Sequence, residues 1–291
     1  MSKSEPQPTV ESVLRDGAAF LARKNIEHPR IACELLLARL LNRPRLSLHL
    51  VGDQSLQEHY LEAMRRGIRR VAAGEPVQYV IGQTEFMGHV FKTDARALIP
   101  RPETETLVHR VLEDKALWAR HHPVIADLGT GTGCIVLSLA KAMPEARYIG
   151  LDPSAAALEL ATENRQVLGL QEQVALAEGD LADAIEPAML DALVANLPYV
   201  ATADWEALPV HIRDHEPRVA LDGGPDGLHV IEQAVQDAVM VLKPQGRLFL
   251  EIGADQGARV TALLRDTGFS DTGIQSDLAG RDRVAFGVWP G

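Results

Sequence analysis

A glycine-rich loop between an apparent strand and an apparent helix constrains the fold of this chain more than any other feature. The apolar run at 124–128 is typical of a buried strand, DLGTGTG covers 127–133, and residues 135–142 have a helical pattern. Glycine adopts positive φ easily and lets a ligand approach the backbone closely. The segment predicts a strand-loop-helix unit with a ligand-binding loop, although such a loop taken alone can also be a tight structural turn.

The chain after residue 100 alternates between strand and helix patterns. We expect strands at 124–128, 148–152, 174–177, 192–195 and 247–252, with strand-like segments near 269–274 and 284–288. We expect helices at 104–118, 135–142, 155–168, 228–242 and 258–267. This alternation predicts an α/β fold with a mostly parallel sheet, helices on both of its faces, and ligands bound at the carboxyl ends of the strands.

The N-terminal part of the chain has a different pattern. Apolar residues at 9–73 recur at the period of a helix, which predicts a small helical domain. Ser55 and Glu58 form a capping-box pattern at the expected start of its last long helix, and β-favouring residues around Gly82 and Gly88 predict a hairpin. We therefore expect a helical domain at 1–75, a β-hairpin linker at 76–100 and an α/β domain at 101–291.

The composition indicates a globular protein. Of its 291 residues, 46% are hydrophobic and 24% are charged, as in ordinary soluble domains. The most apolar helical stretch, 31–41, contains Glu34 and Arg39 and is shorter than the roughly 20 residues of a transmembrane helix. The opening MSKSEPQPTVES lacks the apolar core of a secretory signal, so we expect a cytoplasmic protein.

The net charge of −11 argues against nucleic acid as the main partner, because binding to phosphates demands clustered Lys and Arg. The cluster Arg65, Arg66, Arg69 and Arg70 has helical spacing. It is typical of a solvated helix face, and a docking patch for an acidic or RNA-bearing partner is the alternative.

The two cysteines, Cys33 and Cys134, are too few for a disulfide framework or a metal cluster. We expect both to be reduced, partly buried small residues. No metal site is predicted.

Two acids strengthen the interpretation of the glycine loop as a cofactor site. Asp152 ends the strand after the loop, where an acidic side chain accepts hydrogen bonds from ribose hydroxyls. The loop spacing GxGxG, preceded by an acid, differs from the GxGxxG of dinucleotide sites. Asp180 follows the third strand and can meet an adenine amine, or be an ordinary loop acid. These features favour S-adenosylmethionine over NAD.

A polar tetrapeptide, Asn196-Leu197-Pro198-Tyr199, directly follows the expected strand that ends at 195. An asparagine carbonyl and a neighbouring main-chain carbonyl can accept both hydrogens of a planar NH2 group, and the aromatic ring can stack on it. Such a group suits methylation of an amide or amino nitrogen. Asn followed closely by Pro is otherwise ordinary turn chemistry.

With these segments the chain resembles the release factor glutamine methyltransferase (HemK) family over nearly its whole length. RPETE and DGGPDGL are much more specific than the glycine loop. The matching segments are GEPVQYVIG at 74–82, EFMG at 85–88, LIPRPETE at 98–105, DLGTGTG at 127–133, NLPY at 196–199, EPRVALDGGPDGL at 216–228, LEIG at 250–253 and DLAGRDRVAFG at 277–287.

The resemblance implies a class I S-adenosylmethionine-dependent methyltransferase domain, Rossmann-like with a mostly parallel seven-stranded sheet, and a helical N-terminal domain that helps to dock the substrate. The implied reaction transfers methyl from S-adenosylmethionine to the side-chain amide nitrogen, N5, of the glutamine in the Gly-Gly-Gln motif of peptide chain release factors.

The resemblance also implies roles for residues. Residues 101–105 would lie near the site at the domain junction, and a helix-start acid is an equal alternative for Glu103. The implied catalytic residues are Asn196, Leu197, Pro198 and Tyr199. The implied cofactor-binding residues are Gly129, Thr130, Gly131, Thr132, Gly133, Asp152, Asp180, Leu181 and Asn196.

Two positions depart from the family pattern. Leu197 stands where the family usually has proline, but its main-chain carbonyl survives, so we expect activity to remain. Leu181 stands where some relatives have an aromatic residue, which weakens a stacking role at the adenine.

Other functions remain open at this point. The same tetrapeptide would serve a glutamine methyltransferase acting on a ribosomal protein. A DNA adenine-N6 methyltransferase is less favoured, because the net charge does not suggest a basic target face. A nonenzymatic interaction module is disfavoured by the joint presence of Asp152, Asn196 and Tyr199.

Overall fold

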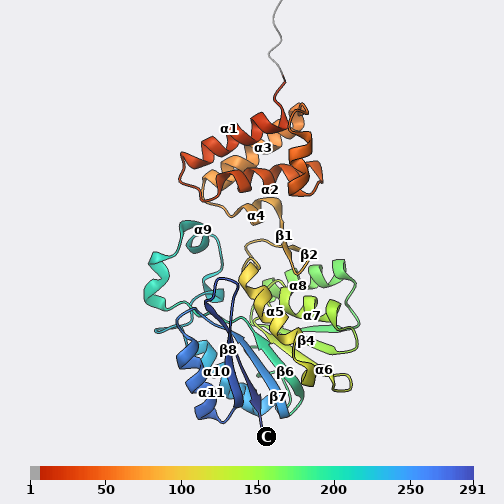
Figure 1. Cartoon of the computed structure of the whole chain (residues 1–291), viewed down its shortest axis with the longest axis vertical. Helices are drawn as coiled ribbons and strands as arrows, with labels where there is room; N and C mark the ends of the chain where they lie inside the picture. The colour runs from red at the N-terminus through yellow and green to blue at the C-terminus, as the bar shows by residue number, and fades with distance from the viewer. Residues whose placement is uncertain (1–6) are drawn as a thin grey trace, which may run out of the picture. The chain divides into compact units, whose positions relative to one another are not determined.

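The computed structural model describes residues 7–291, which divide into two compact units (Figure 1). The first, here called the helical unit, runs to Gln83 and includes Pro209–His215. The second, the sheet unit, comprises Thr84–Leu208 and Glu216–Gly291. The finer division at residues 75 and 100 stays a proposal.

The helical unit buries one apolar core between its three longest helices. Leu14, Leu37 and Met64 are among its fully buried side chains, and burial of such faces supplies most of the stability of helices of this length. Its elements are α1 (Val10–Ala22), α2 (Pro29–Leu41), η1 (Arg45–Val51), α3 (Glu58–Ala72), α4 (Val77–Ile81) and α9 (Val210–Arg213).

The start of α3 differs from the predicted capping box. The helix begins at Glu58 after Gln57, and no side chain caps it. Ser55 is held instead in an isolated β-bridge with Thr9, which places it outside the N-cap position, so the prediction was wrong. A capping box occurs at α1, where the Thr9 hydroxyl accepts from the main-chain N–H of Ser12.

The predicted hairpin is present but shorter than expected. It consists of β1 (Gln83–Phe86) and β2 (His89–Lys92), whereas Val77–Ile81 forms a helix rather than a strand. Gly82, at φ 72°, ends this helix in the left-handed conformation that favours glycine. The local stop signal therefore outweighs the β propensity of the residues before it.

The sheet unit contains the predicted seven-stranded, mostly parallel sheet of a Rossmann-like fold. The strand order is β5-β4-β3-β6-β7-β9-β8, and β9 alone runs in the direction opposite to the other six strands. The strands are β3 (Val124–Leu128), β4 (Arg147–Asp152), β5 (Val174–Glu178), β6 (Leu190–Ala195), β7 (Leu242–Glu251), β8 (Ser270–Ser276) and β9 (Asp282–Trp289).

Helices cover both faces of this sheet (Figure 1). Side chains alternate across β6: Leu193 belongs to the core that contains α10 and α11, and Val194 to the core that contains α5 and α7. The helices of the unit are η2 (Pro102–Thr104), α5 (Glu105–Leu112), α6 (Lys115–Trp118), α7 (Cys134–Ala142), α8 (Ala155–Leu168), η3 (Thr202–Ala207), η4 (Arg218–Ala220), α10 (His229–Val241) and α11 (Gly257–Thr267).

Across residues 7–291, no helix is both long enough and apolar enough to cross a lipid bilayer. Cys33 and Cys134 are buried and free of disulfides. The same residues include no group of three or more His, Cys, Asp or Glu placed to hold a metal ion.

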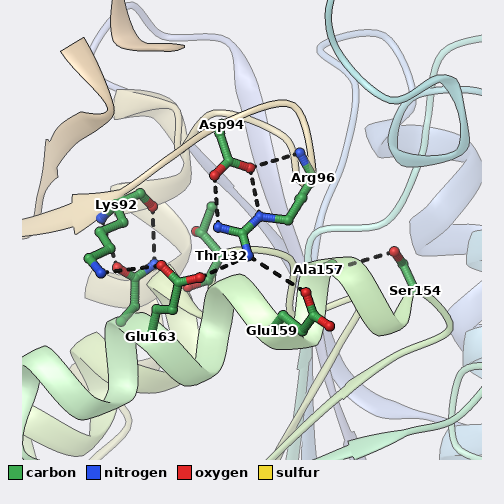
Figure 2. A network of polar contacts seen from close by, with 9 residues as sticks. Lys92, Asp94, Arg96, Thr132, Ser154, Ala157, Glu159 and Glu163 are labelled. Carbon is green, nitrogen blue, oxygen red and sulfur yellow. Dashed lines mark hydrogen bonds and ion pairs between the residues drawn. The ribbon is translucent and has the colours of Figure 1, made fainter. Parts of the chain in front are cut away.

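A buried asparagine on α8 ties the glycine loop to β2. Asn164 Nδ2 donates to the main-chain oxygens of Thr132 at 2.9 Å and Lys92 at 3.1 Å, and its Oδ1 accepts from the Lys92 N–H at 2.7 Å. Figure 2 shows the outer part of this network, where Arg96 and the Lys92 ammonium both donate to Glu163. One buried side chain thus fixes the backbone on which the loop rests.

Asn164→Ala is expected to lower the free energy of unfolding of the sheet unit by about 3 kcal/mol, because buried main-chain groups lose their partner. Glu163→Ala removes only partly exposed ion pairs and should cost less than about 1 kcal/mol. Urea unfolding followed by tryptophan fluorescence compares the two variants, since Trp118, Trp205 and Trp289 all lie in the sheet unit. Equal losses would contradict this interpretation.

Candidate active site

A cavity of about 570 Å³ lies at the carboxyl edge of the sheet. Strand β3 pairs with β4 on one side and with β6 on the other, so the strand order changes direction at β3. Open α/β sheets bind ligands at the carboxyl ends of the strands at such a switch point. Gly133 and Tyr199, both expected at the site, are not in the lining. The expected residues that line the cavity are Gly129, Thr130, Gly131, Thr132, Asp152, Asp180, Leu181, Asn196, Leu197 and Pro198.

The glycine loop forms the cavity wall at the end of β3. Gly129 and Gly131 have φ of 66° and 54°, a conformation that side-chain-bearing residues rarely adopt. Below the loop, the fully buried Asp127 accepts a 2.7 Å hydrogen bond from the Thr130 hydroxyl. Burial raises the pKa of Asp127 to about 7, against the lowering effect of that bond. Asp127 therefore supports the loop from inside.

Asp152 connects the glycine loop to the start of α8. Its two carboxylate oxygens accept main-chain N–H bonds from Gly131 at 2.8 Å and Ser154 at 2.9 Å. Burial raises the pKa of Asp152, and these two bonds oppose that rise. Each oxygen keeps further acceptor capacity, so the carboxylate can also receive hydroxyl groups of a ligand in the cavity.

Asp180 and Leu181 follow β5 and complete this side of the cavity. Leu181 has a φ of 52°, an unusual conformation for a residue with a branched side chain. No local sequence pattern predicts this backbone geometry.

Asn196 and Leu197 form the wall at the end of β6. Asn196 Nδ2 donates to the Thr104 hydroxyl at 3.1 Å, so the amide is held from the side of the RPETE segment. Leu197 is buried, and its Cδ2 lies 3.4 Å from the position that a Cβ on Gly129 would occupy. The two walls of the cavity are thus in contact.

Tyr199 lies behind this wall. Its hydroxyl donates to Glu251 Oε1 at 3.3 Å, and its main-chain oxygen accepts from Gln256 at 3.1 Å. Burial, followed by the Glu251 carboxylate, raises the pKa of Tyr199, so the phenol stays protonated. The expected stacking of Tyr199 on a bound amide remains a prediction.

The DGGPDGL segment packs against the back of the tetrapeptide. A Cβ on Gly223 would lie 2.5 Å from the main-chain oxygen of Pro198 and 2.9 Å from Tyr199 Cα. Val200 and Gly223 are joined by a 2.8 Å main-chain hydrogen bond. Glycine is required at this position because only backbone fits there.

Glu216 is a residue of the site that sequence reasoning missed. Its fully buried carboxylate accepts from Arg101 Nη2 at 2.5 Å and from the Ile99 N–H at 3.3 Å. It joins two segments that line the cavity, 96–101 and 217–220. The signal that could have found it is its place as the first residue of the matching segment EPRVALDGGPDGL, whereas its partners lie more than a hundred residues away.

The remaining predicted positions are less central. Arg101 and Thr104 line the cavity, whereas Glu103 is exposed and lies outside the lining. Glu105, at the start of α5, accepts from the Met87 N–H at 2.6 Å. Burial raises the pKa of Cys134, so this thiol has the character of a buried small residue rather than a nucleophile.

Two known families match separate parts of the chain. Residues 12–82 match the family described as PrmC N-terminal domain. Residues 104–211 match the family described as Methyltransferase small domain. The two matches fall on the helical unit and on the core of the sheet unit.

Curated relatives match nearly the full length of the chain. Proteins named release factor glutamine methyltransferase from Moorella thermoacetica and Geobacter sulfurreducens are 44% and 38% identical, over 94% and 96% of this chain and 96% of each relative. Among solved structures, a T. thermophilus 16S rRNA methyltransferase in complex with AdoMet and guanosine is 19% identical with a TM-score of 0.51, over 71% of this chain and 49% of that chain. This last likeness concerns the fold alone. At the identity and coverage of its curated relatives, the chain belongs to the release factor glutamine methyltransferase family.

Proposed function

We propose that this protein methylates the N5 amide nitrogen of the glutamine in the Gly-Gly-Gln motif of peptide chain release factors, with S-adenosylmethionine as the methyl donor. The observation that carries the proposal is that the glycine loop and Asn196–Pro198 line one cavity.. The names of the curated relatives support this substrate class.

The β3–β4 side of the cavity fits an adenosine cofactor. Gly129 and Gly131 present backbone without side chains, and Asp152 keeps acceptor capacity for ribose hydroxyls beyond its two N–H bonds. We assign Asp180 and Leu181 to the adenine end, on the ground that both line the cavity after β5. S-adenosylmethionine supplies an electrophilic methyl group when bound.

Asn196 and Leu197 are the proposed grip for the glutamine amide. Because Asn196 Nδ2 is engaged by Thr104, its Oδ1 is left to accept one amide hydrogen, and the Leu197 carbonyl accepts the other. Two acceptors orient the nitrogen lone pair without a general base. Alignment of two reactants lowers a barrier by about 7 to 11 kcal/mol, so positioning is the main catalytic contribution of these residues.

The helical unit is the proposed docking element for the release factor. Its basic cluster on α3 has the features of a solvated face: Arg65 pairs with Glu58 and Arg70 with Glu75, and all four arginines are exposed. The cytoplasm is the proposed location, as expected from the sequence MSKSEPQPTVES. The net charge of −11 supports the separate proposal that the protein does not bind DNA directly.

Purified protein should transfer labelled methyl from S-adenosylmethionine to an unmethylated release factor, with the mark located by mass spectrometry on the Gly-Gly-Gln glutamine. A release factor with Gln→Ala at that position is the matched control and should stay unlabelled. Labelling of a ribosomal protein instead would keep the chemistry and replace the partner. Strong labelling of duplex DNA would contradict the proposal that the protein does not bind DNA directly.

Asn196→Ala should bind S-adenosylmethionine within a few-fold of the wild-type affinity but lose roughly 100-fold or more in turnover, because the amide is no longer aligned. Calorimetry with the cofactor and a turnover assay separate the two effects. Met240→Ala, at a residue 63% exposed on α10, is the surface control. Normal turnover in Asn196→Ala would refute the grip.

Gly223→Ala should reduce turnover about tenfold or more, because its Cβ displaces the Pro198 carbonyl and with it the grip, and a misplacement of about 1 Å is enough for such a loss. The matched glycine control is Gly52→Ala, whose added Cβ meets nothing closer than 3.7 Å. Turnover at saturating cofactor and release factor is the measurement. Equal activity of the two variants would show that the grip does not depend on this backing.

A further inference from the structure

One wall of the cavity carries an apolar side chain that is open to water. Residues 217–222, here called the rim, line the cavity except at Leu221. Val219 lies in the rim, within the short helix η4, and is 68% exposed. Covering an apolar side chain is favourable, so a valine at this place gains free energy from a ligand that packs on it. The mechanism of the proposed function assigns no role to Val219.

Hydrogen bonds hold the rim in place. Asp222 Oδ2 accepts from Arg218 Nε at 3.1 Å and from Arg218 Nη2 at 2.9 Å. Asp222 Oδ1 accepts from the Thr202 hydroxyl at 2.7 Å and from the Gly224 N–H at 3.2 Å. The Asp222 N–H donates to the main-chain oxygen of Arg218 at 2.9 Å. Because one acid ties η4 to the segments on both sides of it, Val219 is presented in a defined position.

The rim is joined to the proposed grip through Val200, which directly follows the tetrapeptide. Val200 forms an isolated parallel β-bridge with Asp222. Its N–H donates to the Leu221 carbonyl at 3.0 Å, and its carbonyl accepts from the Gly223 N–H at 2.8 Å. The adenosine side of the cavity, in contrast, is assigned to segments that follow β3, β4 and β5. The rim therefore borders the part of the cavity into which the glutamine side chain is proposed to enter.

The charge of the rim indicates the class of its partner. Its one cation, Arg218, forms an ion pair with Asp222. Binding of a nucleic-acid backbone demands positive charge that is free to neutralise phosphates, and a paired arginine does not offer it. An apolar side chain next to a neutral pair suits the main chain of a protein loop instead.

We propose that Val219 is a specificity-determining residue that packs on the release factor loop beside the target glutamine. The inference rests on the proposed function, since it names the surface that receives the loop whose glutamine enters the cavity. Glycine has no side chain to shield its backbone, so the glycines of a Gly-Gly-Gln loop leave main chain open to contact by a valine. Val219 contributes to the binding of the protein substrate and not to the methyl transfer.

The first test compares Val219→Asp with Val167→Asp at saturating cofactor. A carboxylate at the rim loses the apolar contact and must be desolvated, so the KM for the release factor should rise about tenfold or more. The kcat and the affinity for S-adenosylmethionine should stay unchanged, as expected when only ground-state binding is lost. Val167 is 63% exposed on α8 and lies outside the cavity lining, so its variant should match the wild type.

A conservative variant checks that the effect comes from the apolar contact. Val219→Ile keeps a branched apolar side chain and should keep the KM of the wild type. Calorimetry with S-adenosylmethionine shows that each variant is folded and has an intact cofactor site. The proposal would be overturned if KM were the same in Val219→Asp and Val167→Asp, or if Val219→Asp lowered kcat and left KM unchanged.

A cross-linking experiment locates the contact without turnover. The two cysteines of the chain, Cys33 and Cys134, are buried, so Val219→Cys supplies an accessible thiol that can be labelled with a benzophenone maleimide. With purified, unmethylated release factor and S-adenosylhomocysteine, light should join the probe to residues beside Gly-Gly-Gln, located by mass spectrometry. Val167→Cys, labelled in the same way, should give no such product.

The cross-link separates this proposal from the proposed function. If the probe joins the Gly-Gly-Gln loop while no release factor is methylated, the proposed reaction fails and the contact at Val219 stands. If release factor is methylated but the probe joins only other regions of it, or none, the contact at Val219 fails alone.

Discussion

The parallel pairing of β3 with β6 is the interaction on which the site depends. The register sets Leu128 opposite Ala195, so Gly129 and Asn196 leave the sheet at the same level although 67 residues separate them along the chain. Main-chain hydrogen bonds between buried strands fix this register, since a shift by one residue would turn every side chain of β6 to the other face. The proposed cofactor side and the proposed substrate side of the cavity therefore share one rigid edge.

Support for the tetrapeptide comes from segments remote in sequence. Thr104 holds the Asn196 amide, Gln256 holds the Tyr199 carbonyl, and Gly223 fills the space behind Pro198. Each contact is made inside the protein, where a lost hydrogen bond leaves a buried group without a partner and costs more than it would in water. A grip supported in this way is preorganised, which is what a reaction that depends on alignment requires.

The sequence was informative where a local pattern carries the structure. Periodicity placed β3 at 124–128 and α8 at 155–168, as the structure has them, because a buried strand and an amphipathic helix each leave a repeating signature. The cavity-lining residues of the glycine loop and of the tetrapeptide were named for the same reason, since turn residues follow strands at fixed offsets.

Other features leave no local signature. Glu216 and Glu251 look like ordinary acids in the sequence, and their partners are set by tertiary contacts such as the 115-residue separation between Arg101 and Glu216. The helix at Val77–Ile81 was missed because a proline and a glycine at its ends outweigh β-favouring residues between them. The place of Tyr199 behind the cavity rather than in its lining could not be read from its neighbours, because burial of a ring depends on what packs above it.

The contacts of Glu216 and Val200 also say which part of the chain is free to change in length. Val200 is hydrogen-bonded to Leu221 and Gly223, and Glu216 is anchored to Ile99 and Arg101, so the cavity wall is pinned on both sides of the stretch 203–215. Pro209–His215 belongs to the helical unit, so insertions or deletions confined to 203–208 are the ones expected to leave the pinned wall where it is. The exposed surface of this stretch can therefore vary while the residues that line the cavity keep their positions.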